Sequence, residues 1–306
     1  MKWGDFRRSE NVDDRTGEDS GGRGFPGGGS IKLGGGALVV IVIASLIFGV
    51  NPLEMIGMME GGGPLTQPAP PETAPGHGPR QAPAPGGPRP PTGPPNAAKD
   101  FAAAVLGDTE DVWGAVFQSM GARYAPPRLV LFSNRTQSAC GHASAAMGPF
   151  YCSADRELYL DTAFFDVLAR RFGAPGEFAQ AYVIAHEVGH HVQNLTGTMG
   201  KVDQQMQRLD ERGRKALSVR LELQADCYAG VWGYFAQRRN KLDTGDLEAG
   251  LRAAAAVGDD QIQKQTQGYV APESFTHGSA DQRQRWFRVG LESGDMRQCN
   301  TFAAGR

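Results

Sequence analysis

The hydrophobic and polar positions divide the chain into four zones. Residues 1–32 are polar, glycine-rich and of mixed charge, a composition that predicts a disordered arm. Residues 33–50 form an apolar run without a charged side chain, close to the minimum length of a membrane-spanning helix. Residues 51–97 are rich in Pro, Gly and Ala, which predicts a semi-extended linker. Residues 98–306 have the composition of a globular domain.

Within that domain, apolar positions recur mainly at helical spacing. This spacing predicts helices over residues 100–120, 163–172, 178–195, 201–239 with a break near Gly213, 246–257 and 280–291. Strand signals are confined to the region before the third of these helices. They predict a strand over 128–132 and a hairpin formed by 148–152 and 157–160 around a four-residue loop. The predicted fold class is therefore α+β, a mainly helical domain with a small β-sheet.

The helix over 178–195 contains the pattern His-Glu-x-x-His, formed by His186, Glu187 and His190. Side chains four residues apart lie on one helical face, so both imidazoles can bind one ion. Two neutral imidazoles suit Zn²⁺, and Glu187 can act as general base toward a zinc-activated water. The alternative is a chance match in a chain with six histidines. Against it, two unpaired histidines and a carboxylate are costly to bury without a metal.

Catalytic zinc needs a third protein ligand, and the candidates after the motif are a few acids and His277. Glu222 is the best of them, because it lies where apolar residues replace the charged stretch before it. Asp226 follows four residues later on the same face. One carboxylate can bind the metal while the other accepts a hydrogen bond from the outer nitrogen of a ligand histidine. The alternative is a solvated acidic stripe.

Three segments, 186–190, 222–226 and 275–283, together resemble the neutral zinc metallopeptidase family of membrane-anchored bacterial proteins. More distantly, the chain is similar to the gluzincin endopeptidases, which include the CAAX prenyl proteases. The resemblance implies a zincin-like domain with Glu222 as the third zinc ligand. It also implies that His277 stabilises the oxyanion, although Gly278 stands where those enzymes have proline. The alternative for His277 is a loop histidine with a local hydrogen bond.

Basic residues near the apolar run predict its orientation. Arg15, Arg23 and Lys32 precede the run, and no basic residue follows it before Arg80. This asymmetry predicts a single-pass anchor in the inner or plasma membrane, with a cytoplasmic N-terminus and a periplasmic or extracellular domain. A cleaved signal peptide and a buried core helix are the alternatives.

The four cysteines form no Cys-x-x-Cys pair, which argues against a thiolate zinc site. An even number in an exported domain predicts two disulfides. Among the three pairings we favour Cys140 with Cys152 and Cys227 with Cys299, with a free thiol at Cys227 as the alternative. The net charge of −2 gives no electrostatic case for nucleic-acid binding.

Together these features predict a membrane-anchored zinc metallopeptidase that hydrolyses peptides or proteins, with Zn²⁺ as its cofactor. One alternative is a non-catalytic metal-binding scaffold of the cell envelope with the same fold, and another is an amidase acting on cell-wall peptides. The sequence leaves open the physiological substrate, endo- or exo-cleavage, and the oligomeric state.

Overall fold

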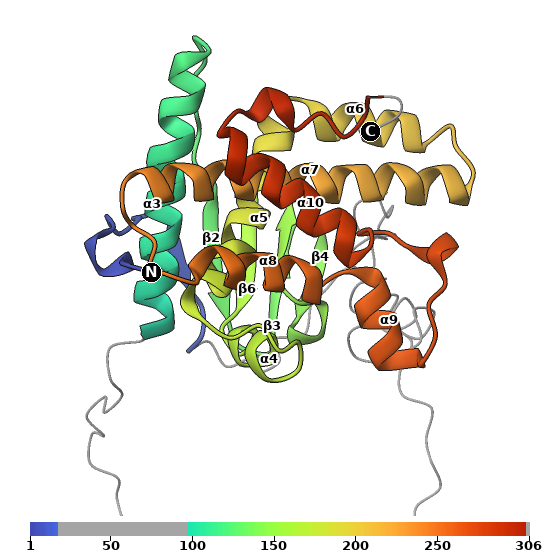
Figure 1. Ribbon diagram of the computed structural model, residues 1–306, viewed down its shortest axis with the longest axis horizontal. Coiled ribbons are helices and arrows are strands. Elements are labelled where there is room, and N and C mark those ends of the chain that lie inside the picture. Colours follow the sequence, from blue (N-terminus) through green and yellow to red (C-terminus); the bar gives the residue numbers. More distant parts are fainter. Residues whose placement is uncertain (18–96, 304–306) are drawn as a thin grey trace, which may run out of the picture.

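The structure, a computed structural model, describes residues 1–17 and 97–303. These residues form a layer of helices packed on a small sheet (Figure 1), which confirms the predicted α+β class. The predicted anchor at 33–50 lies outside the described residues, as does the linker up to residue 96. None of the helices in the described part of the chain has the length and apolarity needed to cross a membrane.

The helices of the described residues are α3 (Ala97–Ser119), α4 (Phe164–Arg170), α5 (Glu177–Leu195), α6 (Thr198–Met206), α7 (Glu211–Arg238), α8 (Asp246–Ala256), α9 (Asp259–Gln267) and α10 (Ala280–Ser293). Short 3-10 turns occur at η1 (Trp3–Asp5), η2 (Ala145–Met147), η3 (Pro272–Ser274) and η4 (Met296–Gln298). The strands are β1 (Val12–Asp14), β2 (Arg128–Phe132), β3 (Arg135–Ser138), β4 (Gly141–Ser144), β5 (Phe150–Cys152) and β6 (Glu157–Asp161).

The main sheet has the order β1-β2-β6-β5. Strands β1, β2 and β6 are parallel, and β5 pairs antiparallel with β6. The predicted hairpin is confirmed, because Cys152 pairs with Glu157 around a loop of four residues. Strands β3 and β4 form a separate antiparallel pair, which the sequence patterns did not predict.

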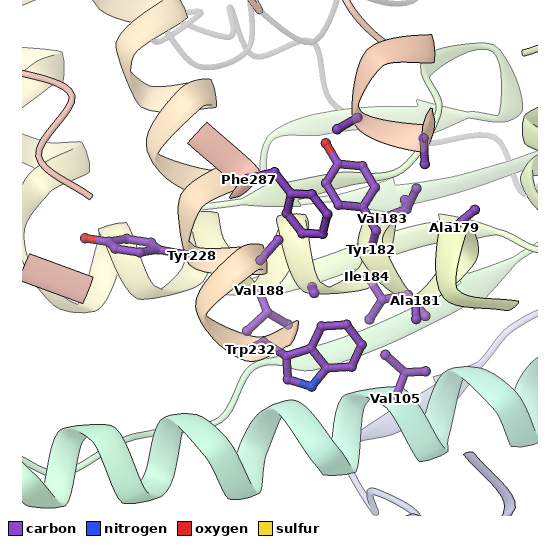
Figure 2. Packing of buried hydrophobic residues seen from close by; sticks show 14 of the residues in the cluster. Val105, Ala179, Ala181, Tyr182, Val183, Ile184, Val188, Tyr228, Trp232 and Phe287 are labelled. Atoms are coloured by element: carbon purple, nitrogen blue, oxygen red, sulfur yellow. The ribbon is translucent and has the colours of Figure 1, made fainter. Parts of the chain in front are cut away.

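Helices α5 and α7 cross at the centre of the molecule and carry most of the chemistry described below. Trp232 of α7 stacks on Phe178 of α5 with ring centroids 5.6 Å apart, and both rings are fully buried. Figure 2 shows Trp232, Val188 and Phe287 gathered in this core. The crossing is close because Gly189 has no side chain: a Cβ there would lie 2.8 Å from the carbonyl oxygen of Ala225.

Gly189→Ala is therefore expected to destabilise the fold by about 1–3 kcal/mol, because the added methyl group forces the two helices apart. Urea unfolding of the metal-free protein measures this, since a loss of metal affinity does not then contribute. The matched control is Gly200→Ala on α6, where nothing lies within 4 Å of the added Cβ. That change should be neutral or stabilise by up to about 1 kcal/mol. Equal stability of the two variants would contradict the tight crossing.

Both favoured disulfides are confirmed. Cys140 is bonded to Cys152, and Cys227 is bonded to Cys299. The first bond links the β3–β4 region to β5, and the second ties the chain after η4 to α7. No cysteine of the chain is free.

The prediction of a disordered arm is wrong for residues 1–17. This segment forms η1 and β1, and β1 extends the sheet by pairing with β2. The composition predicts disorder because the segment buries few side chains, Phe6 and Ser9 among them. Its order comes instead from hydrogen bonds and ion pairs to residues far away in sequence.

Two further features of the helices differ from the prediction. The charged helical region breaks at residues 207–210 rather than near Gly213. The reason is the N-cap of α7, where the Asp210 side chain accepts a hydrogen bond from the Gly213 backbone N–H at 2.8 Å. Helix α9 was not predicted, because it is largely polar and has few apolar positions to reveal its period.

Candidate metal centre

Three side chains from two helices converge at the α5–α7 crossing. His186 and His190 lie one turn apart on α5, and Glu222 faces them from α7. Their ligand atoms all lie within 4.8 Å of one another. Glu222 Oε2 is 3.2 Å from His186 Nε2, and Glu222 Oε1 is 3.5 Å from His190 Nε2. The structure thus brings together the three residues that the sequence predicts as metal ligands.

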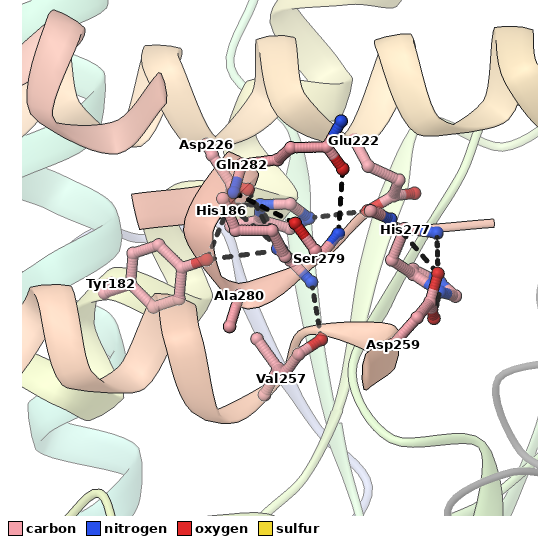
Figure 3. Close-up of polar contacts among 12 residues, drawn as sticks. Tyr182, His186, Glu222, Asp226, Val257, Asp259, His277, Ser279, Ala280 and Gln282 are labelled. Carbon is pink, nitrogen blue, oxygen red and sulfur yellow. Dashed lines mark hydrogen bonds and ion pairs between the residues drawn. The ribbon is translucent and has the colours of Figure 1, made fainter. Parts of the chain in front are cut away.

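Asp226 holds Nδ1 of His186, the ring nitrogen that does not face Glu222, as predicted. His186 Nδ1 donates to Asp226 Oδ1 at 2.8 Å, and the Tyr182 hydroxyl donates to the same oxygen at 2.5 Å (Figure 3). Because Nδ1 is occupied as a donor, the neutral ring presents the lone pair of Nε2 toward Glu222. This tautomer is the one that binding a metal at Nε2 requires.

The charge of Asp226 is balanced by Arg283 from α10. Arg283 Nε donates to Asp226 Oδ2 at 2.8 Å, and a terminal nitrogen donates to Oδ1 at 2.9 Å. Asp226 is fully buried and Arg283 is 4% exposed. Burial opposes ionisation of the carboxyl, but the Arg283 guanidinium and then His186 hold the pKa of Asp226 below its usual value. Asp226 therefore orients His186 as an anion.

His190 has a corresponding partner that the sequence analysis missed. Its Nδ1 donates to Gln193 Oε1 at 2.9 Å. The Gln193 side chain is fully buried, and its amide nitrogen donates to the Leu221 carbonyl oxygen at 2.7 Å. Gln193 thus fixes the tautomer of His190 and links it to the turn of α7 before Glu222. Its position three residues after His190 was the available sequence signal.

Gln193→Met, which keeps the length of the side chain but removes its acceptor, should weaken metal binding about 10–100-fold. The cause is that His190 Nδ1 loses its partner and the ring is free to turn. Competition with a chromophoric zinc chelator measures the affinity. Asn194→Ala is the control, because the Asn194 amide contacts the Tyr151 hydroxyl instead. An unchanged affinity in Gln193→Met would show that the glutamine does not orient the ligand.

Glu187 lies beside the first histidine and is 9% exposed. It borders a small apolar pocket between α5 and the sheet, lined also by Pro149, Leu158, Val183 and Ile184. Burial raises the pKa of the Glu187 carboxyl above its ordinary value, against the opposing influence of the two nearby imidazoles. A carboxyl in such surroundings is a stronger base than one in water.

His277 lies on the loop before α10 and is 6% exposed. Its Nδ1 donates to Asp259 Oδ1 at 2.9 Å, whereas its buried Nε2 has no hydrogen-bond partner within the part of the chain that the structure describes. Burial opposes ionisation of the Glu222 carboxyl. His190 and then His277, through its positive charge, nevertheless hold the pKa of Glu222 well below its usual value. Figure 3 shows His277 beside Glu222.

Asp259 is a second residue that the sequence analysis missed. Its Oδ2 accepts hydrogen bonds from the backbone N–H groups of Thr276, His277 and Gly278 at 2.7, 2.7 and 3.1 Å. These bonds clamp the loop that carries His277. No local pattern reveals this role, because Asp259 and His277 are 18 residues apart.

His191 follows His190 on α5 but is not one of the three converging side chains. It is 1% exposed and points away from the centre, where its Nε2 donates to the Ala125 carbonyl oxygen at 2.7 Å. The Tyr151 hydroxyl lies 3.1 Å from its Nδ1. Burial lowers the pKa of His191 to about 4, so the ring is neutral and structural.

The chain is similar in sequence to a described family and to several known proteins. A family model described as "Putative neutral zinc metallopeptidase" matches residues 1–302. The "Uncharacterized protein YpfJ" of Escherichia coli (strain K12) is 43% identical over 303 residues, which cover 99% of each chain. The "Uncharacterized protein Mb2605" of Mycobacterium bovis is 49% identical over 201 residues, or 62% of this chain and 67% of the relative. No solved structure matches. The chain therefore belongs to the family described as "Putative neutral zinc metallopeptidase".

Proposed function

We propose that this protein is a zinc-dependent peptidase in which His186, His190 and Glu222 hold the metal. The observation that carries the proposal is the convergence of three donor groups within 4.8 Å. Both imidazoles are also fixed through their outer nitrogens, by Asp226 and Gln193. Two imidazoles and one carboxylate, with room for a water molecule, are the donor set of catalytic zinc in several hydrolases.

A bound zinc ion supplies Lewis acidity, which lowers the pKa of a water molecule from about 15.7 to about 7. Glu187 acts as the general base: it takes a proton from the attacking water and passes it to the leaving amine. A buried carboxylate beside the metal site serves hydrolysis and has no evident use in a scaffold that only binds metal. This favours the peptidase over the scaffold.

His277 is proposed to donate a hydrogen bond from Nε2 to the oxyanion that forms on the substrate carbonyl. The buried, unpartnered Nε2 and the anchoring of Nδ1 by Asp259 support this role. A donor held in place before the reaction needs no rearrangement when charge develops.

His277→Ala should lower kcat by about 10²–10³ while leaving the bound zinc unchanged, because the donor acts on the transition state. Peptide-cleavage kinetics and elemental analysis of the same samples measure both quantities. His142→Ala, which removes an exposed histidine on β4, is the control. Zinc loss in His277→Ala would make it a metal ligand, and an unchanged kcat would remove it from the chemistry.

The substrate is proposed to be an extended peptide that pairs with the outer edge of β5. Strand β6, the last strand before α5, does not provide a free edge, because it lies between β2 and β5. Strand β5 has no strand on its other side among the described residues, and it packs against α5. Main-chain pairing at such an edge is a common way to bind peptides.

The test of the function is digestion of a peptide library by the full-length protein, first stripped of metal by a chelator and then reloaded with zinc. We expect cleavage only after reloading, together with the recovery of one zinc per chain. Mass spectrometry of the products distinguishes internal from terminal cleavage. Zinc binding without any cleavage would favour the scaffold. Membrane anchoring through residues 33–50 stays a separate prediction, since that run lies outside the described residues.

A further inference from the structure

The first 17 residues lie against four parts of the peptidase domain: β2, α3, the start of α5 and the segment that leads into α8. Strand β1 pairs in parallel with β2, so that Val12 lies opposite Leu129 and Asp14 opposite Leu131. On either side of this pairing, the Leu129 N–H donates to the Asn11 carbonyl oxygen and the Arg15 N–H donates to that of Leu131, both at 2.8 Å. The segment therefore completes one edge of the sheet.

Ion pairs attach the same segment to helix α3. Arg8 forms a two-pronged pair with Asp100, with nitrogen–oxygen distances of 2.8 and 2.7 Å. Arg7 pairs with Glu110 at 2.7 Å and with Asp111 at 2.9 Å. Close backbone approach accompanies these pairs, since a Cβ on Gly107 would collide with the carbonyl oxygen of Arg7.

The chain terminus itself lies between the start of α8 and the start of α5. The Met1 ammonium lies 3.1 Å from carboxylate oxygens of Asp243 and Asp246 and 3.6 Å from one of Glu177, the first residue of α5. The Trp3 indole N–H donates to the other oxygen of Glu177 at 2.8 Å. Figure 1 shows the terminus beside α3, next to the loop that leads into α8.

We infer that residues 1–17 are a structural part of the peptidase domain, and that the N-terminus lies in the same compartment as residues 97–303. The chain leaves one folded body at residue 17 and returns to that body at residue 97. A cytoplasmic N-terminus with the domain on the far side of a membrane would require every contact described above to be broken. The family match also begins at residue 1, as expected of a segment that belongs to the fold.

This inference replaces the opposite-side arrangement predicted from the basic residues around 33–50. It does not depend on the proposed hydrolysis, because the contacts lie on α3, β2 and the starts of α5 and α8 rather than at the candidate metal centre. A catalytically silent protein with the same fold would have its N-terminus in the same place.

The shared compartment is tested with two variants of the full chain that each add one cysteine, Glu10→Cys in the segment and Arg123→Cys in the domain. Both positions are exposed, and the native cysteines are all in disulfides. Bacterial spheroplasts that express each variant are treated with a membrane-impermeant maleimide, before and after permeabilisation. We expect the two positions to behave alike, either both labelled at once or both only after permeabilisation. Labelling of only one position in intact spheroplasts would overturn the inference.

Docking is tested by a charge swap in the full-length protein. Arg8→Glu and Asp100→Arg should each lower the melting temperature by about 2–4 °C, because each places like charges together. The double variant restores an ion pair and should melt no lower than either single variant. Arg123→Glu, with the same charge change at an exposed site, is the control. Single variants without effect, or a double variant in which the losses add, would show that Arg8 and Asp100 do not meet.

Discussion

Glu187→Gln is expected to keep its zinc and to lower kcat by about 10²–10⁴, the usual contribution of a general base. The amide has nearly the volume of the carboxylate, so the packing of α5 against the sheet should persist. It has no basic oxygen that can take a proton from water and return it to the leaving amine. Peptide-cleavage kinetics on metal-analysed samples measures the effect.

The matched control is Glu248→Gln on the exposed face of α8. It makes the same chemical change away from the metal centre and should leave kcat within a factor of two, as expected of a surface site. If Glu187→Gln cleaves as fast as the native protein, Glu187 is not the base. If the native protein and Glu187→Gln both fail to cleave any peptide, the metal-binding scaffold becomes the better description.

Arg283→Met is expected to destabilise the protein by about 3–5 kcal/mol, because it leaves the buried Asp226 carboxylate without its cationic partner. Two hydrogen bonds to Asp226, at 2.8 and 2.9 Å, are lost together. The stability lost is a large fraction of that of an ordinary domain. Denaturant unfolding of the metal-free protein measures it.

The effect of Arg283→Met should also depend on pH with a defined sign. The folded-state pKa of Asp226 is depressed in the native protein, so the pair stabilises the fold above the ordinary carboxyl pKa. This stabilisation is lost as the pH falls through the depressed pKa. The difference in free energy of unfolding between the native protein and the variant should therefore become smaller on acidification. If this difference in free energy of unfolding instead grows on acidification, Asp226 is not ionised in the folded protein.

Arg297→Met is the control for this prediction. Arg297 also pairs with an aspartate, Asp295, but its side chain is 84% exposed. Solvent screens such a pair, so its removal should leave the stability almost unchanged. Equal losses in the two variants would mean that burial does not decide the strength of the Asp226 pair.

The grouping of the candidate metal ligands was largely predictable because its geometry is helical. The four-residue spacing of His186 and His190 places both rings on one face, and the same spacing relates Glu222 to Asp226. Residues that are three or four positions apart in sequence are neighbours on the surface of a helix. Once two such helices cross, four of the residues in the centre are determined.

The remaining features depend on contacts between distant segments. Asp259 holds His277 through backbone N–H groups 17 to 19 residues away, and nothing near Asp259 distinguishes it from a solvated acid. The docking of residues 1–17 depends on Arg8 meeting Asp100, 92 residues away. Hydrophobic periodicity reports local burial, so a polar segment held by long-range ion pairs resembles disorder.

The most direct test of the metal centre is the zinc content of the purified full-length protein beside that of Glu222→Ala. Glu211→Ala, which removes an exposed acid from the same helix, serves as the control. We predict one zinc per chain in the native protein and in the control, and none retained after gel filtration in Glu222→Ala. Native protein without stoichiometric metal, or undiminished zinc in Glu222→Ala, would contradict a centre formed by His186, His190 and Glu222.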